Sequence, residues 1–200
     1  MPKQTNHIIN QQYWENRYTN HTDTWDLQQT SPPLKAYINQ LTNKALPILI
    51  PGCGHAHEAQ YLYQQGFTNI TIIDIAKPLI NAIKAKFKNT TVNVLHQNIF
   101  NHNQQYHLIL EQTLFCALHP TQRLQYIKKL HQLLEPNGKL VGLLFNKMFN
   151  TFGPPFGGFK ANYEPMFAPY FKFNTFEACY NSLPPRATNG GELFINFTKI

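Results

Sequence analysis

Two glycines and an aspartate have the residue types and the spacing of a nucleoside-binding site. Gly52 and Gly54 follow a short apolar run at residues 47–51, and Asp74 ends the next apolar run. Glycines let a backbone approach a ligand closely, and an acid about twenty residues further on accepts both hydroxyls of a ribose. The two signals together indicate an adenosine-containing cofactor. The alternative is a tight structural turn with Asp74 as a helix cap.

The residues after the turn narrow the choice of cofactor. Gly54 is followed by His-Ala-His-Glu, without the third glycine that packs a helix over a pyrophosphate, and the chain has no Gly-x-x-x-x-Gly-Lys-Ser/Thr loop. S-adenosylmethionine carries no phosphate and needs only the close approach and the ribose acid, so the residues favour it. His55 and His57 stand two apart, unlike zinc-binding histidines at i and i+4 of a helix, and no metal is expected.

The elements that must position these residues alternate along the chain. We expect parallel strands joined by helices, then two strands that pair antiparallel because no helical run separates them. The expected strands are 47–51, 69–73, 92–95, 106–110, 139–145, 170–179 and 192–200, and the expected helices are 9–18, 34–41, 56–65, 78–87 and 124–134. This predicts an α/β fold: a Rossmann-like, mostly parallel seven-stranded sheet with helices on both faces and an antiparallel C-terminal edge strand.

Length and composition limit the remaining possibilities. The 200 residues suit a single domain, which we divide into an N-terminal helical lid at 1–45 and a core at 46–200. The net charge is +7, but the basic residues are scattered, so no nucleic-acid partner is expected. The three distant cysteines predict reduced thiols, and no apolar run is long enough for a membrane span or a signal peptide. We therefore expect a cytoplasmic monomer that acts on a small molecule.

Four groups of residues follow one another along the chain in a characteristic order. They are Trp14-Glu-Asn-Arg-Tyr18 with Thr24-Trp25-Asp26 and Pro33-Leu34; Leu49-Ile-Pro-Gly-Cys-Gly54; Leu114-Phe-Cys-Ala-Leu118 with Pro120 and Arg123; and Gly153-Pro-Pro-Phe156 with Tyr163, Pro185-Arg186 and Glu192. They resemble the lid, the glycine turn, the segment after strand four and the acceptor-side segment of class I S-adenosylmethionine-dependent methyltransferases. Within that class the resemblance is to the thiopurine S-methyltransferase superfamily, which includes thiol and halide methyltransferases of the plant type.

The resemblance implies S-adenosylmethionine as cofactor, S-adenosylhomocysteine as its product, and a set of cofactor-binding residues. That set is Trp14, Trp25, Gly52, Cys53, Gly54, Asp74, Ile75, Asn98, Ile99 and Glu111. Asn98 replaces an acid that the family commonly has, so an amide oxygen would contact the adenine amino group, and Glu111 replaces an aspartate. Trp14 and Trp25 are expected to pack on the cofactor as a lid, with ordinary core tryptophans as the alternative.

The acceptor side is expected at Phe115, Phe156, Tyr163 and Arg186: two apolar walls, a phenol donor and a cation that favours an anionic substrate. The alternative for Arg123 and the two phenylalanines is a purely structural role in packing. A thiolate or halide is already anionic and needs no general base, and no catalytic residue is assigned. The expected reaction is in-line methyl transfer to a thiol, thiopurine, thiocyanate or halide. The alternatives are O-, N- or metalloid-oxyanion methylation of a small metabolite, a catalytically degenerate S-adenosylmethionine-binding protein and a nucleic-acid-binding protein.

Overall fold

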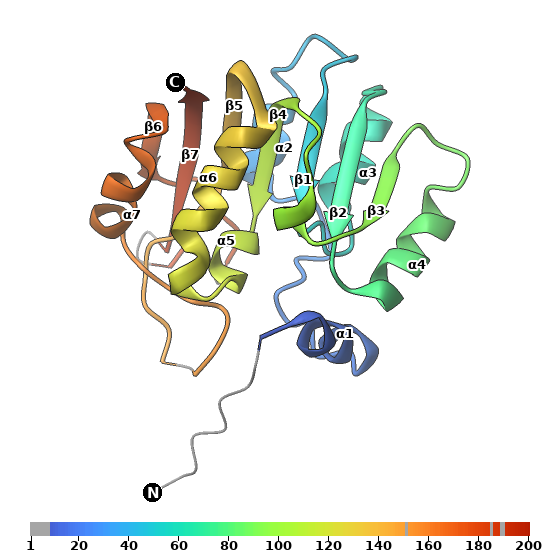
Figure 1. The fold of residues 1–200 in the computed structure, drawn as a ribbon, viewed down its shortest axis with the longest axis horizontal. Helices are drawn as coiled ribbons and strands as arrows, with labels where there is room; N and C mark the ends of the chain where they lie inside the picture. Colours follow the sequence, from blue (N-terminus) through green and yellow to red (C-terminus); the bar gives the residue numbers. More distant parts are fainter. Residues whose placement is uncertain (1–8, 151, 185, 189–190) are drawn as a thin grey trace, which may run out of the picture.

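The computed structural model describes residues 9–150, 152–184, 186–188 and 191–200, and one mixed sheet lies at its centre (Figure 1). The sheet order is β3-β2-β1-β4-β5-β7-β6. The strands are β1 (Ile48–Pro51), β2 (Ile70–Asp74), β3 (Asn93–His96), β4 (Tyr106–Gln112), β5 (Leu134–Phe145), β6 (Phe171–Ala178) and β7 (Glu192–Lys199).

The strand directions confirm the predicted fold class. β1 to β5 are parallel, and β7 runs antiparallel to both β5 and β6. β7 therefore lies one place in from the edge, and β6 is the edge strand. The chain leaves β1 toward β2 and β3, then returns to β4 on the other side of β1. In open α/β sheets, ligands bind beyond the carboxyl ends of the strands at such a reversal.

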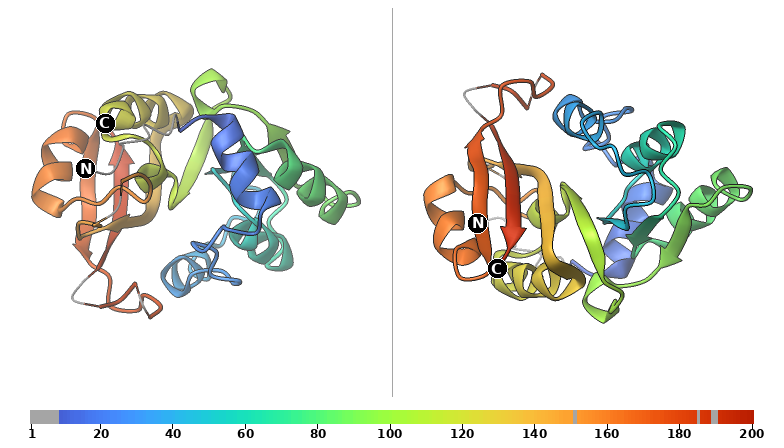
Figure 2. Two further views of the ribbon diagram at one scale, coloured as in Figure 1. Left: turned by 90° about the horizontal axis from the view of Figure 1, so that it is seen from below. Right: turned by 90° about the horizontal axis from the view of Figure 1, so that it is seen from above.

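Helices cover both faces of the sheet because successive strand residues point to opposite sides. Ile48 and Ile50 of β1 pack with the helices α2 and α3, whereas Leu49 packs on the side of α6 and α7. Figure 2 shows α2 and α3 on one face and α6 on the other. The helices are α1 (Gln11–Thr19), α2 (Pro32–Ile38), α3 (His57–Gln64), α4 (Lys77–Lys86), α5 (Leu114–Ala117), α6 (Arg123–Leu133) and α7 (Lys160–Phe167).

The helices α5 and α7 and the start of β5 differ from the prediction, and α5 is a single short helix where none is expected. The helix α7 lies where only a loop rich in proline and glycine is expected, and it contains Pro165. Its buried Tyr163 and Phe167 join the core on the side of α6, so packing outweighs the local helix-breaking signal. β5 begins at Leu134 instead of Lys139, directly after α6.

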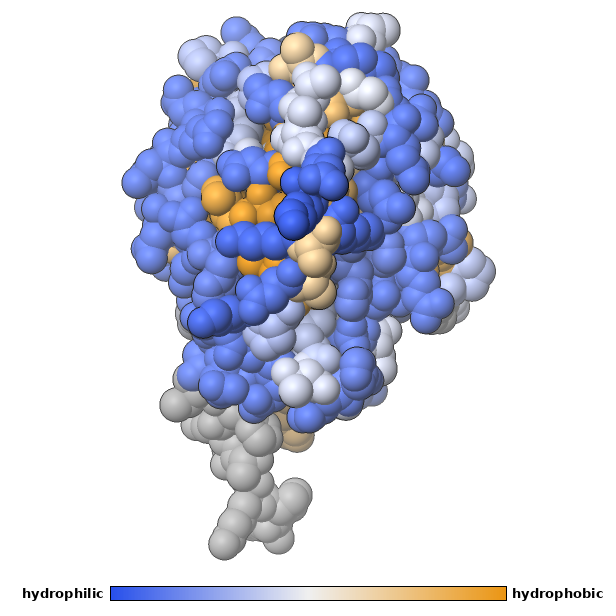
Figure 3. Space-filling model, turned by 90° about the vertical axis from the view of Figure 1, so that its right-hand side faces the viewer, coloured by the Kyte–Doolittle hydropathy of each residue, from blue (hydrophilic) through white to orange (hydrophobic). Residues whose placement is uncertain are grey.

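The helix α1 lies across the end of the sheet where β1 and β2 finish (Figure 1). The face that includes α4 and β3 is largely hydrophilic, with a small apolar area near its centre (Figure 3). Within the described ranges no helix is both long and apolar enough to cross a membrane. Residues 1–8 of the expected lid, and Pro185 of the acceptor-side motif, lie outside the described residues.

Candidate functional site

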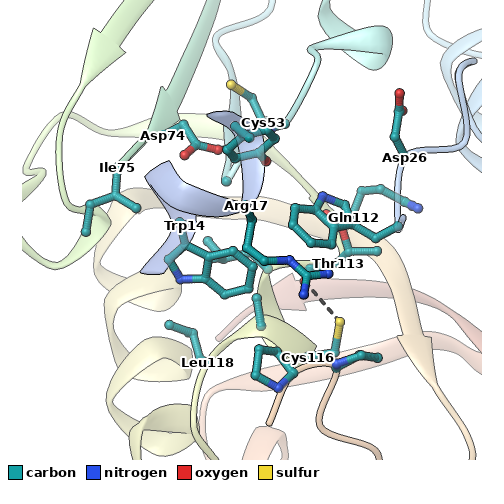
Figure 4. Close-up of a pocket in the computed structure, with 18 of the residues that line it drawn as sticks. Trp14, Arg17, Asp26, Cys53, Asp74, Ile75, Gln112, Thr113, Cys116 and Leu118 are labelled. Atoms are coloured by element: carbon teal, nitrogen blue, oxygen red, sulfur yellow. Dashed lines mark hydrogen bonds between the residues drawn. The ribbon is translucent and has the colours of Figure 1, made fainter. Parts of the chain in front are cut away.

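A pocket of about 1580 Å³ opens beyond the carboxyl ends of the strands. Its walls come from α1 and the loop after it, the turn after β1, the ends of β2 and β4, and the loops after β3 and β5. Figure 4 shows side chains from these separate elements pointing into one space. The pocket lies at the strand-order reversal where the sequence predicts ligand binding.

The turn after β1 requires glycine at its first position. Gly52 has a φ of +60°, and a Cβ added there would lie 2.9 Å from the Leu114 Cβ. Gly54, with a φ of +51°, donates its backbone N–H to the Asp74 carboxylate at 3.3 Å. Ala56 follows at a φ of +60° as the N-cap of α3. The turn is therefore held against the end of β2, with its backbone exposed to the pocket.

Asp74 holds the backbone before α4 and forms part of the pocket wall. Its Oδ1 accepts the Ala76 N–H at 3.0 Å, next to the start of α4, and its Oδ2 accepts the bond from Gly54. Burial raises the pKa of Asp74, and the backbone bonds oppose that rise. Ala76 is itself the N-cap of α4, and no side chain caps that helix. Of the two roles that the sequence offers, a ribose acid and a helix cap, this geometry is compatible with the first.

Aromatic rings from the N-terminal segment lie over the pocket. Trp14 and Trp25 meet edge to face with ring centroids 5.5 Å apart, and Tyr18 meets Trp25 at 5.6 Å. The Arg17 guanidinium lies 5.1 Å from the centroid of the Trp25 ring. Such rings can exclude water from a reaction and attract a cation through their faces.

Three polar contacts fasten the loop after α1 to the rest of the site. The His55 Nε2 lies 2.6 Å from the Asp23 Oδ2, and the His57 Nε2 lies 2.8 Å from the Asp26 Oδ1. On the other side, Arg186 donates its Nη2–H to the Trp25 carbonyl at 2.6 Å. The two aspartate contacts occupy the histidines, whose i, i+2 spacing argued against a metal site.

Nine of the ten predicted cofactor residues line this pocket: Trp14, Trp25, Gly52, Cys53, Gly54, Asp74, Ile75, Asn98 and Ile99. The Asn98 amide oxygen also accepts the Phe100 N–H at 3.0 Å, which caps a short 3-10 turn. Burial is the main cause that raises the pKa of the Cys53 thiol.

Glu111 is not among the residues that line the pocket, contrary to the prediction. Its carboxylate accepts the Phe115 N–H at 2.8 Å and the Tyr126 hydroxyl at 2.5 Å. Burial raises its pKa to about 7. Because adjacent strand residues point to opposite faces, Glu111 faces α6 while its neighbour Gln112 borders the pocket.

Only Arg186 among the four acceptor-side candidates lines the pocket. The Phe115 and Tyr163 rings pack edge to face at 5.3 Å in the core, and the Tyr163 hydroxyl donates to the Phe145 carbonyl at 3.0 Å. Phe156 packs against His119 with ring centroids 5.4 Å apart. The sequence motif places these residues near the acceptor side, but their side chains point into neighbouring packing instead.

Arg186 and Arg123 both have buried structural contacts. Besides Trp25, Arg186 contacts the Glu192 carboxylate at 3.4 Å. Arg123 donates to the Phe156 and Gly157 carbonyls and lies over the Phe115 ring. These contacts agree with the structural role offered for Arg123 as an alternative.

The pocket residues that were not predicted as ligand contacts include Arg17, Gln112, Lys147 and Cys116. Arg17 lies inside the lid motif and Gln112 at the end of a strand, two positions that could have signalled them. The Cys116 thiol donates to the Thr113 carbonyl at 3.0 Å, and burial raises its pKa to about 12. Within the part of the chain that the structure describes, no cluster of three His, Cys, Asp or Glu side chains could hold a metal ion.

The pocket residues fit S-adenosylmethionine, because a turn with two glycines, a carboxylate at the next strand end and an aromatic cover lie around one space. The sheet and this site define a class, the S-adenosylmethionine-dependent methyltransferases. A model of the thiopurine S-methyltransferase family matches residues 9–196. The chain belongs to that family.

Individual proteins show the same likeness. The chain is 23% identical to thiocyanate methyltransferase 1 of Brassica oleracea, over 78% of this chain and 71% of that protein. It is 31% identical to the malonyl-[acyl-carrier protein] O-methyltransferase of Priestia megaterium, over 73% of this chain and 53% of that protein. Among solved structures, the 1,6-didemethyltoxoflavin-N1-methyltransferase of Burkholderia thailandensis, with S-adenosylhomocysteine bound, superposes with a TM-score of 0.76 at 16% identity, covering 96% and 87% of the two chains.

Proposed function

We propose that this methyltransferase methylates a small soft nucleophile: a thiol, a thiopurine, thiocyanate or a halide. One observation carries the proposal: among the described residues that line the pocket, every histidine and carboxylate already has a partner. His55 and His57 contact aspartates, Asp74 accepts two backbone bonds, and Glu58 accepts the Ser31 N–H at 3.1 Å. An acceptor that is anionic in water needs none of them as a base.

S-adenosylmethionine, when bound, would supply a methyl group activated by its sulfonium for direct transfer to the acceptor sulfur or halide, with S-adenosylhomocysteine as the leaving group. The chain's part is to position the reactants and exclude water. Asp74 would accept the ribose hydroxyls, and Ile75, Asn98 and Ile99 would border the adenine. Residues 9–45 would act as the lid through Trp14 and Trp25.

A carboxylate acceptor is a second candidate, favoured by the 31% identity to an O-methyltransferase. A carboxylate is also anionic at neutral pH and needs no general base. The partners of the pocket histidines and carboxylates therefore do not distinguish a carboxylate acceptor from a thiolate. The acceptor's nucleophilic atom distinguishes the two candidates.

Calorimetric titration with S-adenosylmethionine and S-adenosylhomocysteine, followed by turnover with labelled cofactor, tests the proposal. The acceptor panel is a set of thiols, thiocyanate, iodide and monomethyl succinate. We expect micromolar binding and methylation of at least one soft nucleophile. Turnover of the carboxylate alone would favour the second candidate, and tight binding with no sulfur or halide product would overturn the first.

A further inference from the structure

We infer that His55 and His57 are positioning residues for the cofactor: when protonated they hold the loop after α1 closed over the pocket, and when neutral they hold it less firmly. Closure of the pocket, and with it the affinity for the cofactor, should therefore depend on pH. The inference concerns the lid and the cofactor alone, so it does not depend on which acceptor is methylated.

The loop after α1 has no regular structure that would fix its position. Residues 20–31 form neither helix nor strand. Trp25 lies between Asp23 and Asp26, the two aspartates that contact the histidines. The Asp26 carboxylate points away from the space around Arg17 (Figure 4). The two aspartate contacts therefore fix the loop on both sides of Trp25 and leave that ring to cover the pocket.

Each contact pairs a histidine with a carboxylate that is partly shielded from water. The side chains of Asp23 and Asp26 are 16% and 22% exposed, and those of His55 and His57 are 40% and 24% exposed. Burial opposes the ionisation of Asp23, but the contact with His55 holds its pKa below the ordinary value. Asp23 therefore stays charged between pH 5 and 8, the range in which histidine side chains commonly change charge.

Other ionisable groups face the two histidines from each neighbouring element. They are Tyr18 of α1, His21 of the loop, Glu58 of α3 and Lys86 of α4. A second cavity, of about 490 Å³, lies against the histidine–aspartate contacts, between the loop and α4. Protonation of both histidines adds two positive charges next to two lid carboxylates, so the closed loop gains attraction as the pH falls.

The strength of the contact sets the size of the effect. A hydrogen bond between a histidinium and a carboxylate is roughly twice as strong as one from a neutral imidazole, which still donates its Nε2–H. The cofactor favours the closed loop because Trp25 then covers it, so whatever stabilises closure also raises the affinity. We expect S-adenosylhomocysteine to bind about 5-fold more tightly at pH 5.5 than at pH 8, since partly exposed ion pairs contribute little each.

Calorimetry with S-adenosylhomocysteine from pH 5.5 to 8 compares the wild type with the double variant His55→Gln/His57→Gln. S-adenosylhomocysteine is used because it lacks the sulfonium charge, which protonated histidines would repel. Glutamine keeps an N–H donor but cannot ionise, so the variant resembles the neutral form. The two proteins should bind alike at pH 8 and diverge as the pH falls, because only the wild type gains affinity.

A histidine–carboxylate pair outside the pocket provides the matched control. The His107 Nδ1 lies 3.4 Å from the Glu135 Oε2, and neither residue lines the pocket. His107→Gln should follow the wild type at every pH. A change in affinity common to all three proteins belongs to other groups, including Glu111.

Tryptophan fluorescence shows whether the loop itself responds. Trp14 and Trp25 are the two tryptophans of the chain, and both lie in the lid. Acrylamide quenching of the cofactor-free wild type should increase as the pH rises, and quenching of the double glutamine variant should not change. Turnover is not measured in either assay, so failure of the proposed acceptor chemistry would leave both results interpretable.

Parallel affinity curves for the wild type and the double glutamine variant would overturn the inference. Divergent affinities without any difference in quenching would also overturn it, because the histidines would then act on the cofactor directly. If circular dichroism shows that the glutamine variant is unfolded, Asp23→Asn/Asp26→Asn removes the same charge pairs from the side of the loop. That variant must then lose the gain in affinity at low pH, and a retained gain would refute the role of the two pairs.

Discussion

The Asp74 carboxylate bonds to the backbone before α4 and also lies on the pocket wall. Substitution by asparagine removes the charge but keeps an oxygen that can accept the Ala76 N–H, so α4 should still begin normally. We predict that Asp74→Asn weakens S-adenosylhomocysteine binding about 10- to 100-fold, the worth of hydrogen bonds to a charged group. Calorimetry checks this, with the exposed Glu177→Gln as control. A variant with the wild-type dissociation constant would leave Asp74 with only a structural role, as the acceptor of the Ala76 and Gly54 N–H groups.

Glu111 should make stability depend on pH. Its pKa in the folded protein is about 7, because of burial, against an ordinary 4.5. The folded state therefore holds a proton that the unfolded state has lost, and stability falls as pH rises through this window. The loss between pH 4 and pH 8 should be on the order of 3 kcal/mol.

Urea unfolding of the wild type and Glu111→Gln at several pH values measures this effect. The amide cannot ionise, so the variant should lack the decline, and its stability relative to wild type should improve as pH rises. The exposed Glu164→Gln should follow the wild type. Parallel curves for wild type and Glu111→Gln would show that Glu111 does not titrate in this range.

Residue spacing predicts site residues correctly where the backbone conformation also restricts which residue can occupy the position. Gly52, Gly54 and Asp74 follow from a strand, a turn and the next strand, so their positions were foreseeable. Spacing says nothing of which way a side chain points at a strand end or in a loop. That is why Glu111, Phe115 and Tyr163 were expected at the ligand but pack in the interior.

At the scale of elements, Arg186 connects the lid to the sheet. The single bond from its guanidinium to the Trp25 carbonyl joins residues far apart in the chain. We predict that the double variant Arg186→Met/Glu192→Gln, which removes the bond without leaving a buried charge unpaired, weakens S-adenosylhomocysteine binding about 10-fold. Glu192→Gln alone keeps the bond to Trp25 and serves as the matched control. Calorimetry measures the affinity, and circular dichroism shows whether the double variant is folded. A folded double variant with the wild-type affinity would refute the anchoring role.

The parallel strands and their helices could be predicted because apolar periodicity and turn residues agree along residues 47–134. The same signals fail for α7, where Pro165 argues against a helix that burial of Tyr163 and Phe167 nevertheless stabilises. They also fail at the start of β5, which Pro136 and Gly138 obscure. In both places tertiary packing decides the structure, and a single sequence does not contain that information in local form.

At the scale of the whole molecule, ligand binding should stabilise the fold. The pocket draws its walls from the lid and from several strand ends, so only the folded chain can form it. S-adenosylhomocysteine at 100 times its dissociation constant should add about 2.7 kcal/mol to the free energy of unfolding. For a chain of this size that corresponds to a rise in Tm of roughly 5–10 °C. Scanning fluorimetry measures this rise in Tm, and NAD at the same concentration should leave the Tm unchanged. A shift with NAD and none with S-adenosylhomocysteine would contradict the choice of cofactor.

The place of β7 in the sheet has a consequence for biosynthesis. Because β7 lies between β5 and β6, neither of the two earlier strands can complete its pairing until residues 192–199 have left the ribosome. Until then a nascent chain exposes the backbone edge of β5 and the aromatic residues of β6, surfaces that promote aggregation. Ribosomes that stall before residue 192 should therefore hold a chain that chaperones recognise, even though the glycine turn and Asp74 are already synthesised.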